Sequence, residues 1–231
     1  QTQLFGNLKN DLELFNKICG TKAELLSDIQ NKNFLTGAFA SGDNNVQYLF
    51  LLQLDEASRL NLKQFLPDFD GEQPSVSVHK FERADIYELN YSKSKVAVAF
   101  AKVSGVFIFS ASSVLVENAI LQLKNGDPVT EHAGFKDVYD NMNKKAGYSF
   151  YLNTDQLGNY LSLFSTNDKY ASIMQLSRFV SWMGFEFEFG EAGLNIAGYA
   201  ASKNDESDLL LSKYTGEFSV DMNASVPANT V

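Results

Sequence analysis

The sequence predicts an α+β protein, built on a mainly antiparallel sheet with helices packed on one face. Several apolar segments alternate with a period of two and are separated by turn-forming residues, a pattern typical of hairpins. Other segments repeat apolar residues every three or four positions, as amphipathic helices do. Strands and helices do not alternate regularly along the chain, which disfavours a doubly wound parallel fold.

Composition excludes several classes of protein. The chain has 231 residues, is 45% hydrophobic and contains 19 Phe, so it is not an intrinsically disordered chain. Its net charge of −9 and pI of about 4.7 argue against binding nucleic acid or an anionic membrane surface. No apolar run approaches the ~20 residues that a membrane-spanning helix needs.

The first thirty residues have the pattern of two helices. Gly20 ends the first helix, and Thr21 with Glu24 forms a capping box at the start of the second. The apolar stripe of the first helix is Leu4, Leu8, Leu12 and Phe15.

Strand patterns follow. Residues 34–40 and 46–54 flank a loop of turn formers and predict a hairpin, and a short helix is expected between Asp55 and Pro67. Ser104-Gly105 has the composition of a two-residue hairpin turn. The four strands expected after the short helix are 76–81, 86–91, 95–103 and 106–110.

The second half begins with two helices. Ser113 is the expected cap of a helix that closes at Gly126, and a second helix face is formed by Phe135, Val138, Tyr139 and Met142. The elements expected after them are a strand at 148–153, helices at 155–164 and 169–176, and a hairpin of 185–189 with 194–201.

We expect a single α+β domain over residues 1–222, with sub-lobes 1–146 and 147–222 as one arrangement, and a tail at 223–231. The order helix, helix, hairpin occurs at 3–54 and again at 156–201. Two related lobes would explain this order, and a coincidence of common helical residues would explain it equally well.

No motif carries a recognisable chemistry, so we expect no catalytic residue and no cofactor. Glu186 and Glu188 share one side of a predicted strand, with Cα atoms roughly 6.6 Å apart. Inverting glycosidases separate their carboxyl groups by a comparable distance. The favoured interpretation is structural, with the alternating phenylalanines buried and the glutamates in water.

The few possible metal ligands are also interpreted as structural. One cysteine and two histidines cannot supply the usual zinc clusters, so we expect no metal. His79 and His132 are expected at the surface. Cys19 is expected to be a small buried hydrophobic residue.

The aromatic content is the least ordinary feature, with 19 Phe, 10 Tyr and one Trp. Most of these rings are expected in the core, but some could line a cavity for an apolar ligand. The candidates for such a lining are Tyr87, Tyr91, Trp182, Phe185, Phe187 and Phe189.

Three stretches resemble a bacterial domain-of-unknown-function family of envelope proteins from Gram-negative anaerobes. They are residues 105–112 with the helix that follows, residues 147–153, and the terminal Val226-Pro227-Ala228-Asn229-Thr230. The resemblance implies tandem α+β units facing the periplasm behind a membrane or lipoprotein anchor, with a further unit of the same chain following the tail. It implies no catalytic residue, cofactor or substrate.

These observations lead to three functional hypotheses. The first is a non-enzymatic binding or scaffold module of the cell envelope, whose partner is an unknown envelope protein. The second is a carrier of an apolar, lipid-like ligand held between sheet and helices. The third is a hydrolase using paired carboxylates, which requires two acids in one cleft. We expect a periplasmic location, with an anchor in a segment before Gln1, and no membrane span within this chain.

Overall fold

A computed structural model describes residues 34–41, 45–54, 71–93, 95–126, 128–144, 146–162, 177–190 and 193–203, together with residues 9 and 13. Several predictions lie outside these residues. They are the helices before residue 34, the short helix after Asp55, the helix at 169–176, Cys19 and the tail.

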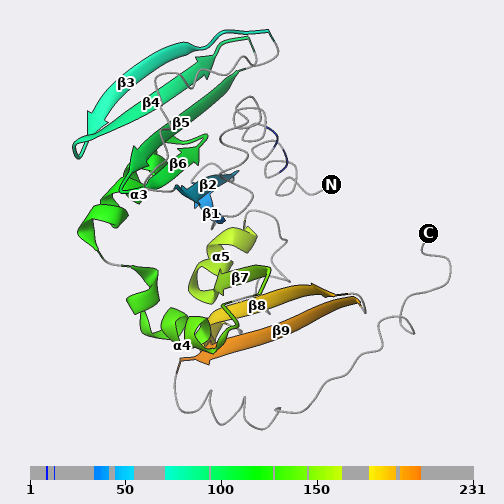
Figure 1. Cartoon of the computed structure of the whole chain (residues 1–231). Helices are drawn as coiled ribbons and strands as arrows, with labels where there is room; N and C mark the ends of the chain where they lie inside the picture. Colours follow the sequence, from blue (N-terminus) through cyan, green and yellow to red (C-terminus); the bar gives the residue numbers. More distant parts are fainter. Residues whose placement is uncertain are drawn as a thin grey trace, which may run out of the picture. The chain divides into compact units, whose positions relative to one another are not determined.

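The described chain is mainly antiparallel sheet with a few helices, as the sequence predicted for its class. The strands form two sheets (Figure 1), one of six strands and one of three. Contacts divide the chain into unit 1, residues 1–129 with 159–164, and unit 2, residues 130–158 with 165–231. The division follows Val129, whereas the lobes considered from the sequence divide after residue 146.

Unit 1 contains the six-stranded antiparallel sheet, in the order β1-β2-β6-β5-β4-β3. Two-residue turns join β3 to β4 and β5 to β6, and these tight connections set the register of each hairpin. The bounds of its strands are β1 Phe34–Ser41, β2 Asn45–Gln53, β3 Ser75–Phe81, β4 Ala84–Tyr91, β5 Val96–Val103 and β6 Val106–Ser110.

Both faces of the central strands of unit 1 are buried. One face packs against α3 (Ser113–Asn125), which buries Val116, Ala119 and Ile120. The other face holds an aromatic cluster in which Phe100 stacks on Tyr87 with ring centroids 5.5 Å apart. Burial on both sides explains why β5 and β6 are almost continuously apolar in sequence.

The caps of α3 differ in part from the prediction. The N-cap is Ser112 and not Ser113, and it makes no side-chain cap hydrogen bond. Its backbone N–H instead donates to Ser110 Oγ at 3.0 Å, so the preceding strand supplies the acceptor. Gly126 ends the helix in the left-handed conformation with φ 66°, as the Asn-Gly sequence predicted.

Unit 2 contains the three-stranded antiparallel sheet β7-β8-β9, which Figure 1 shows with α4 beside it. Its strands are β7 Tyr148–Asn153, β8 Val180–Gly190 and β9 Gly193–Ser202. Its helices are α4 (Ala133–Asn141), preceded by a 3-10 turn η2 (Val129–Glu131), and the start of α5 (Thr154–Ser162).

Two glycines let α4 approach β8 closely. A Cβ on Gly184 would overlap Met142 Sδ and Val138 Cγ1, and a Cβ on Gly134 would overlap Ser181 Oγ. Phe135 of α4 meets Trp182 of β8 edge to face, with ring centroids 5.0 Å apart. The helix therefore covers the side of the sheet to which Trp182 and Gly184 belong.

Candidate functional site

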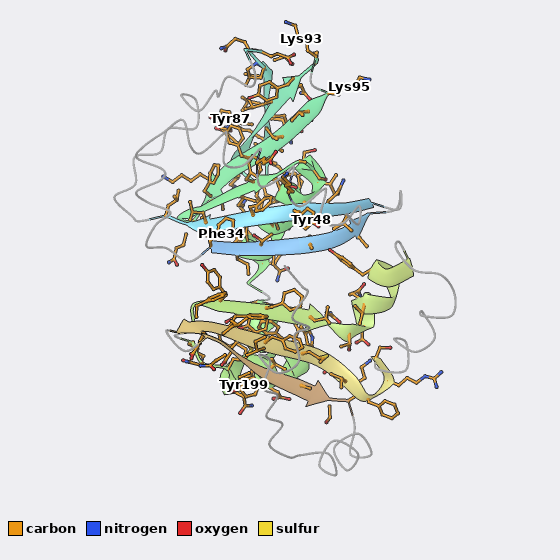
Figure 2. All side chains as sticks on the ribbon, turned by 90° about the vertical axis from the view of Figure 1, so that its right-hand side faces the viewer. Phe34, Tyr48, Tyr87, Lys93, Lys95 and Tyr199 are labelled. Atoms are coloured by element: carbon orange, nitrogen blue, oxygen red, sulfur yellow. The ribbon has the colours of Figure 1, made fainter. Side chains whose placement is uncertain are left out.

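The two tyrosines proposed to line a ligand cavity are core residues of unit 1. Tyr87 and Tyr91 belong to the aromatic cluster on the sheet face opposite α3, and Tyr91 is only 1% exposed. Figure 2 labels Tyr87 on the sheet of unit 1. Their rings pack against neighbouring core side chains, and this is the role that the sequence analysis favoured for most aromatic residues.

The four remaining candidates lie in unit 2 on opposite faces of β8. Trp182 faces α4 and packs on Phe135. Successive side chains of a strand alternate between its faces, so Phe185, Phe187 and Phe189 point to the other side. The described residues therefore do not bring Trp182 and the three phenylalanines into one lining.

The face of the unit 2 sheet opposite α4 is apolar over all three strands. Strand pairing places Tyr148 beside Phe187 and Phe187 beside Ile196. We call this surface the open face, and its residues are Tyr148, Phe150, Leu152, Met183, Phe185, Phe187, Phe189, Leu194 and Ile196. None of them is charged, and Phe189, Tyr148 and Ile196 are 73%, 67% and 54% exposed. Contiguous exposed apolar patches on soluble domains commonly mark interaction sites.

The outer strand of this sheet lacks the usual protection of a sheet edge. β9 has the sequence GLNIAGYAAS, which contains neither a charged residue nor a proline. Natural edge strands are commonly blunted by lysine, proline or inward-facing charges. Among the described residues, β9 pairs only with β8.

The burial expected for the alternating segment of β8 is met at Glu188, which is exposed, but not at Glu186 and Phe189. Glu186 is only 5% exposed on the α4 side, whereas Phe189 lies exposed on the open face. The Glu186 carboxylate accepts a hydrogen bond from the backbone N–H of Asn143, and Glu188 Oε1 accepts one from Asn143 Nδ2 at 2.9 Å. Both carboxylates are thus engaged at the end of α4.

Tyr151, which lies beside this carboxylate pair, has a raised pKa. Burial is the largest cause, and the nearby Tyr139 and Glu186 add to it, while a hydrogen bond with Ser149 acts in the opposite direction. Tyr151 thus stays protonated and neutral well into alkaline solution. Among the described residues, Glu186 and Glu188 lie on the same side of β8 and both hydrogen-bond to Asn143, at the contact between helix and sheet.

The two histidines differ in their surroundings. His79 lies between two acids, with Nε2 3.4 Å from Glu117 Oε1 of α3 and Nδ1 4.0 Å from Glu88 Oε1 of β4. His132 precedes α4, is exposed, and accepts the helical hydrogen bond from Lys136 N through its carbonyl. Both are surface residues, as the sequence analysis predicted.

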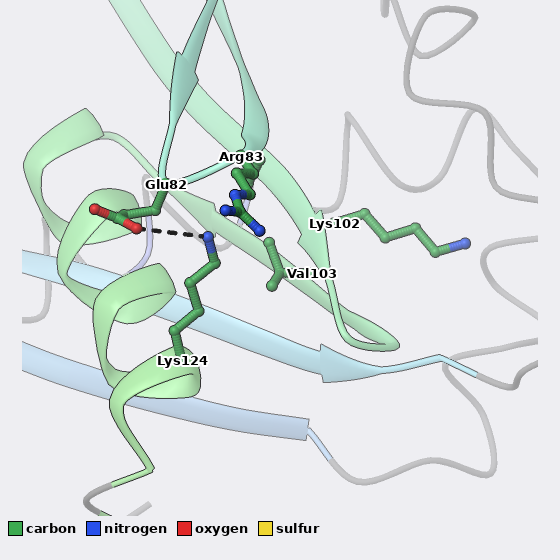
Figure 3. Close-up of a pocket in the computed structure, with 6 residues that line it drawn as sticks. Glu82, Arg83, Lys102, Val103 and Lys124 are labelled. Atoms are coloured by element: carbon green, nitrogen blue, oxygen red, sulfur yellow. Dashed lines mark ion pairs between the residues drawn. The ribbon is translucent and has the colours of Figure 1, made fainter.

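One site was missed from the sequence. A pocket of about 460 Å³ in unit 1, which we call the basic pocket, is lined by Glu82, Arg83, Ala84, Lys102, Val103 and Lys124. Its residues come from the β3–β4 turn, the end of β5 and the last turn of α3 (Figure 3). The sequence analysis began the second of these strands at residue 86, and the Glu82-Arg83 turn contains no glycine or asparagine that would have marked it.

No protein-family model, curated protein or solved structure matches the chain. Within the described residues, no group of three or more His, Cys, Asp or Glu side chains is arranged to hold a metal ion. Among the same residues, no helix has the length and apolar character to cross a membrane.

Proposed function

We propose that the chain is a non-enzymatic binding or scaffold module that takes a strand of another polypeptide at the edge of β9. The observation that carries this proposal is the open face, which spans three strands without a charged side chain. An added strand would hydrogen-bond to the β9 backbone and lay its apolar side chains beside Leu194 and Ile196. Backbone hydrogen bonds then supply affinity, and the apolar contacts select the partner.

A polypeptide partner fits this surface better than the lipid-like ligand considered as the alternative. Ligand carriers hold apolar molecules in concave sites that cover most of the ligand surface. The exposed rings of Phe189 and Tyr148 lie on a sheet face, with their centroids 5.9 Å apart in an edge-to-face arrangement. The aromatic residues of unit 1 pack against one another, so they offer no support for a lining there.

Location in the bacterial envelope is part of the same proposal. It is supported by the resemblance of residues 105–112 and 147–153 to envelope proteins and by the acidic composition. Fractionation of cells producing the full-length protein tests it, with the protein expected in the periplasmic or membrane fraction. We also propose that the chain contains two related lobes, on the strength of the order helix, helix, hairpin at 3–54 and again at 156–201.

Native mass spectrometry of the protein purified from its own source tests the function. We expect the chain to carry a polypeptide, either a second copy or another protein. The Ile196→Lys variant should lose it, because the charge lies on the open face. Val78→Lys is a matched control, since Val78 is 51% exposed on the edge strand of the other sheet. Added mass of lipid size would favour the carrier, and the absence of any addition would contradict the proposal.

A further inference from the structure

The basic pocket of unit 1 is independent of the open face and carries a second inference. We propose that it binds the oxyanion group of a small molecule, a carboxylate or a phosphate, between the side chains of Arg83 and Lys124. Its volume of about 460 Å³ lies within the ~300–1,000 Å³ typical of small-molecule sites. Ala84 and Val103 supply an apolar part of the wall, which suits a ligand with an organic body.

Arg83 is the first of the two cations. Figure 3 shows its guanidinium beside Val103 and close to the end of Lys124. Among the described residues, no carboxylate forms an ion pair with Arg83. A guanidinium offers two parallel N–H donors to a carboxylate or phosphate, so Arg83 supplies the directional part of the site.

Lys124 is the second cation, and it is held only loosely. Its Nζ lies 3.8 Å from Glu82 Oε2, and the two side chains are 31% and 54% exposed. An exposed pair of this kind contributes little to stability, so Lys124 can turn to an incoming anion. Lys102 lines the pocket with its stem, while its ammonium runs away from the other cations (Figure 3).

The local charge of the pocket opposes that of the whole protein. Three basic side chains and one acidic side chain line it, although the chain carries a net charge of −9. Distant surface charges are screened beyond about 8 Å at physiological ionic strength. An anion in the pocket therefore responds mainly to Arg83, Lys124 and Glu82.

The backbone of the β3–β4 turn holds the two residues Glu82 and Arg83 in a defined conformation. Glu82 and Arg83 both have positive φ angles, 49° and 68°, as a type I′ turn requires. Asn-Gly is the preferred sequence for this turn, and the corresponding turn of unit 1, Ser104-Gly105, does contain glycine. Glutamate and arginine thus occupy positions that disfavour them, as Lys95 and Ser104 also do, so a glycine at position 83 fits the same turn without strain.

Titration of the full chain with inorganic phosphate and with benzoate tests the proposal. Calorimetric binding and melting temperature are measured against sodium chloride at equal ionic strength. We expect binding of at least one of the two anions, with a rise in melting temperature that follows occupancy. Arg83→Gly should weaken binding at least tenfold. Glu82→Gln should strengthen it several-fold, because it removes a carboxylate that competes for Lys124.

Lys95→Gly is the matched control. Lys95 has φ 52° and lies in the connection between β4 and β5. Arg83 lies in the turn between β3 and β4, at the other end of β4, and Figure 2 labels Lys95. This variant removes the same charge from a similar backbone conformation outside the pocket, so it should bind as the wild type does. A response to phosphate alone identifies a phosphate ligand, and a response to benzoate alone a carboxylate. Equal binding by wild type and Arg83→Gly, or no response to either anion, would overturn the proposal.

Discussion

The carboxylate of Glu186 accepts a hydrogen bond from the backbone N–H of Asn143, which lies just beyond the end of α4. Glu186 stands in the middle of β8 and is almost completely buried. The Glu186 side chain therefore ties the end of the helix to β8, the central strand of the unit 2 sheet. Because it occupies the covered side of β8, the phenylalanines on either side of it belong to the open face.

Replacing Glu186 should destabilise unit 2. Glu186→Ala leaves the Asn143 N–H without its buried acceptor, which costs about 1–3 kcal/mol in the free energy of unfolding. Glu188→Ala serves as the control, because Glu188 accepts its hydrogen bond at an exposed position and its loss should cost less than about 0.5 kcal/mol. Urea unfolding measures both changes. Equal losses in the free energy of unfolding would show that the buried Glu186 contact stabilises unit 2 no more than the exposed Glu188 contact.

The close approach of α4 to β8 predicts a second difference in stability. In Gly184→Ala the new methyl group overlaps Val138 and Met142, so the helix or sheet must shift at a cost of about 1–3 kcal/mol. Gly198→Ala adds a methyl group 3.4 Å from the Phe185 ring on the open face, where it should change stability by less than about 0.5 kcal/mol. Thermal unfolding distinguishes the two, and a tolerated Gly184→Ala would contradict the observed packing.

Tyr160 of unit 1 offers a substitution that should stabilise the protein. It packs against the aromatic cluster, and within the described residues its buried hydroxyl has no hydrogen-bond partner. Tyr160→Phe removes this polar atom and should raise the free energy of unfolding by roughly 1 kcal/mol. Tyr160→Ala is expected to lose several kcal/mol through the cavity it leaves. A destabilised Tyr160→Phe variant would mean that the hydroxyl is hydrogen-bonded after all.

The same residue predicts a dependence on alkaline pH. Burial, with a smaller effect of Tyr48, holds the pKa of the Tyr160 phenol above its ordinary value near 10. The folded state then keeps a proton that the unfolded state releases, so stability is full below about pH 10 and falls as the pH rises further. Unfolding measured between pH 9 and about pH 11 should show a smaller alkaline loss in Tyr160→Phe than in the wild type.

The strained β3–β4 turn predicts opposite effects of substitution on stability and on binding. Glu82→Asn with Arg83→Gly gives the preferred type I′ sequence and should stabilise unit 1 by about 1–2 kcal/mol while it removes the anion site. Gly105→Ala is the reverse control, because Gly105 has φ 77° and a Cβ there would meet only Leu54 O at 3.8 Å, an ordinary contact, so the backbone conformation is what penalises a side chain there. Melting temperatures should rise in the first variant and fall in the second.

Much of the fold could be predicted because each local pattern agrees with its tertiary surroundings. The six strands of unit 1, the helix that ends at Gly126 and the Ser104-Gly105 turn all lie within a few residues of the positions predicted. Tyr87, Leu89 and Tyr91 share a buried face, as their spacing indicated. Periodicity and turn chemistry are local signals, so these features can be read from a single segment.

The orientation of β8 could not be predicted in the same way. Alternation defines two faces but does not say which one meets a helix, so the burial of Glu186 and the exposure of Phe189 were not expected, whereas Glu188 is exposed as predicted. The decisive feature is Gly184, which shares a face with Glu186 and gives α4 room to approach. The basic pocket escaped notice because Glu82, Arg83 and Lys124 are brought together only by the pairing of β3 with β4 and the packing of α3.

Site-specific photo-cross-linking from the open face tests the central claim most directly. A photoreactive phenylalanine analogue is placed at position 196 of the full-length protein in its own cells, and at position 78 as the control. We predict a discrete polypeptide adduct from position 196 that position 78 does not give, and that charge introduced at Leu194 abolishes. Cross-links only to lipid, or the same adducts from both positions, would contradict a polypeptide-binding role for this surface.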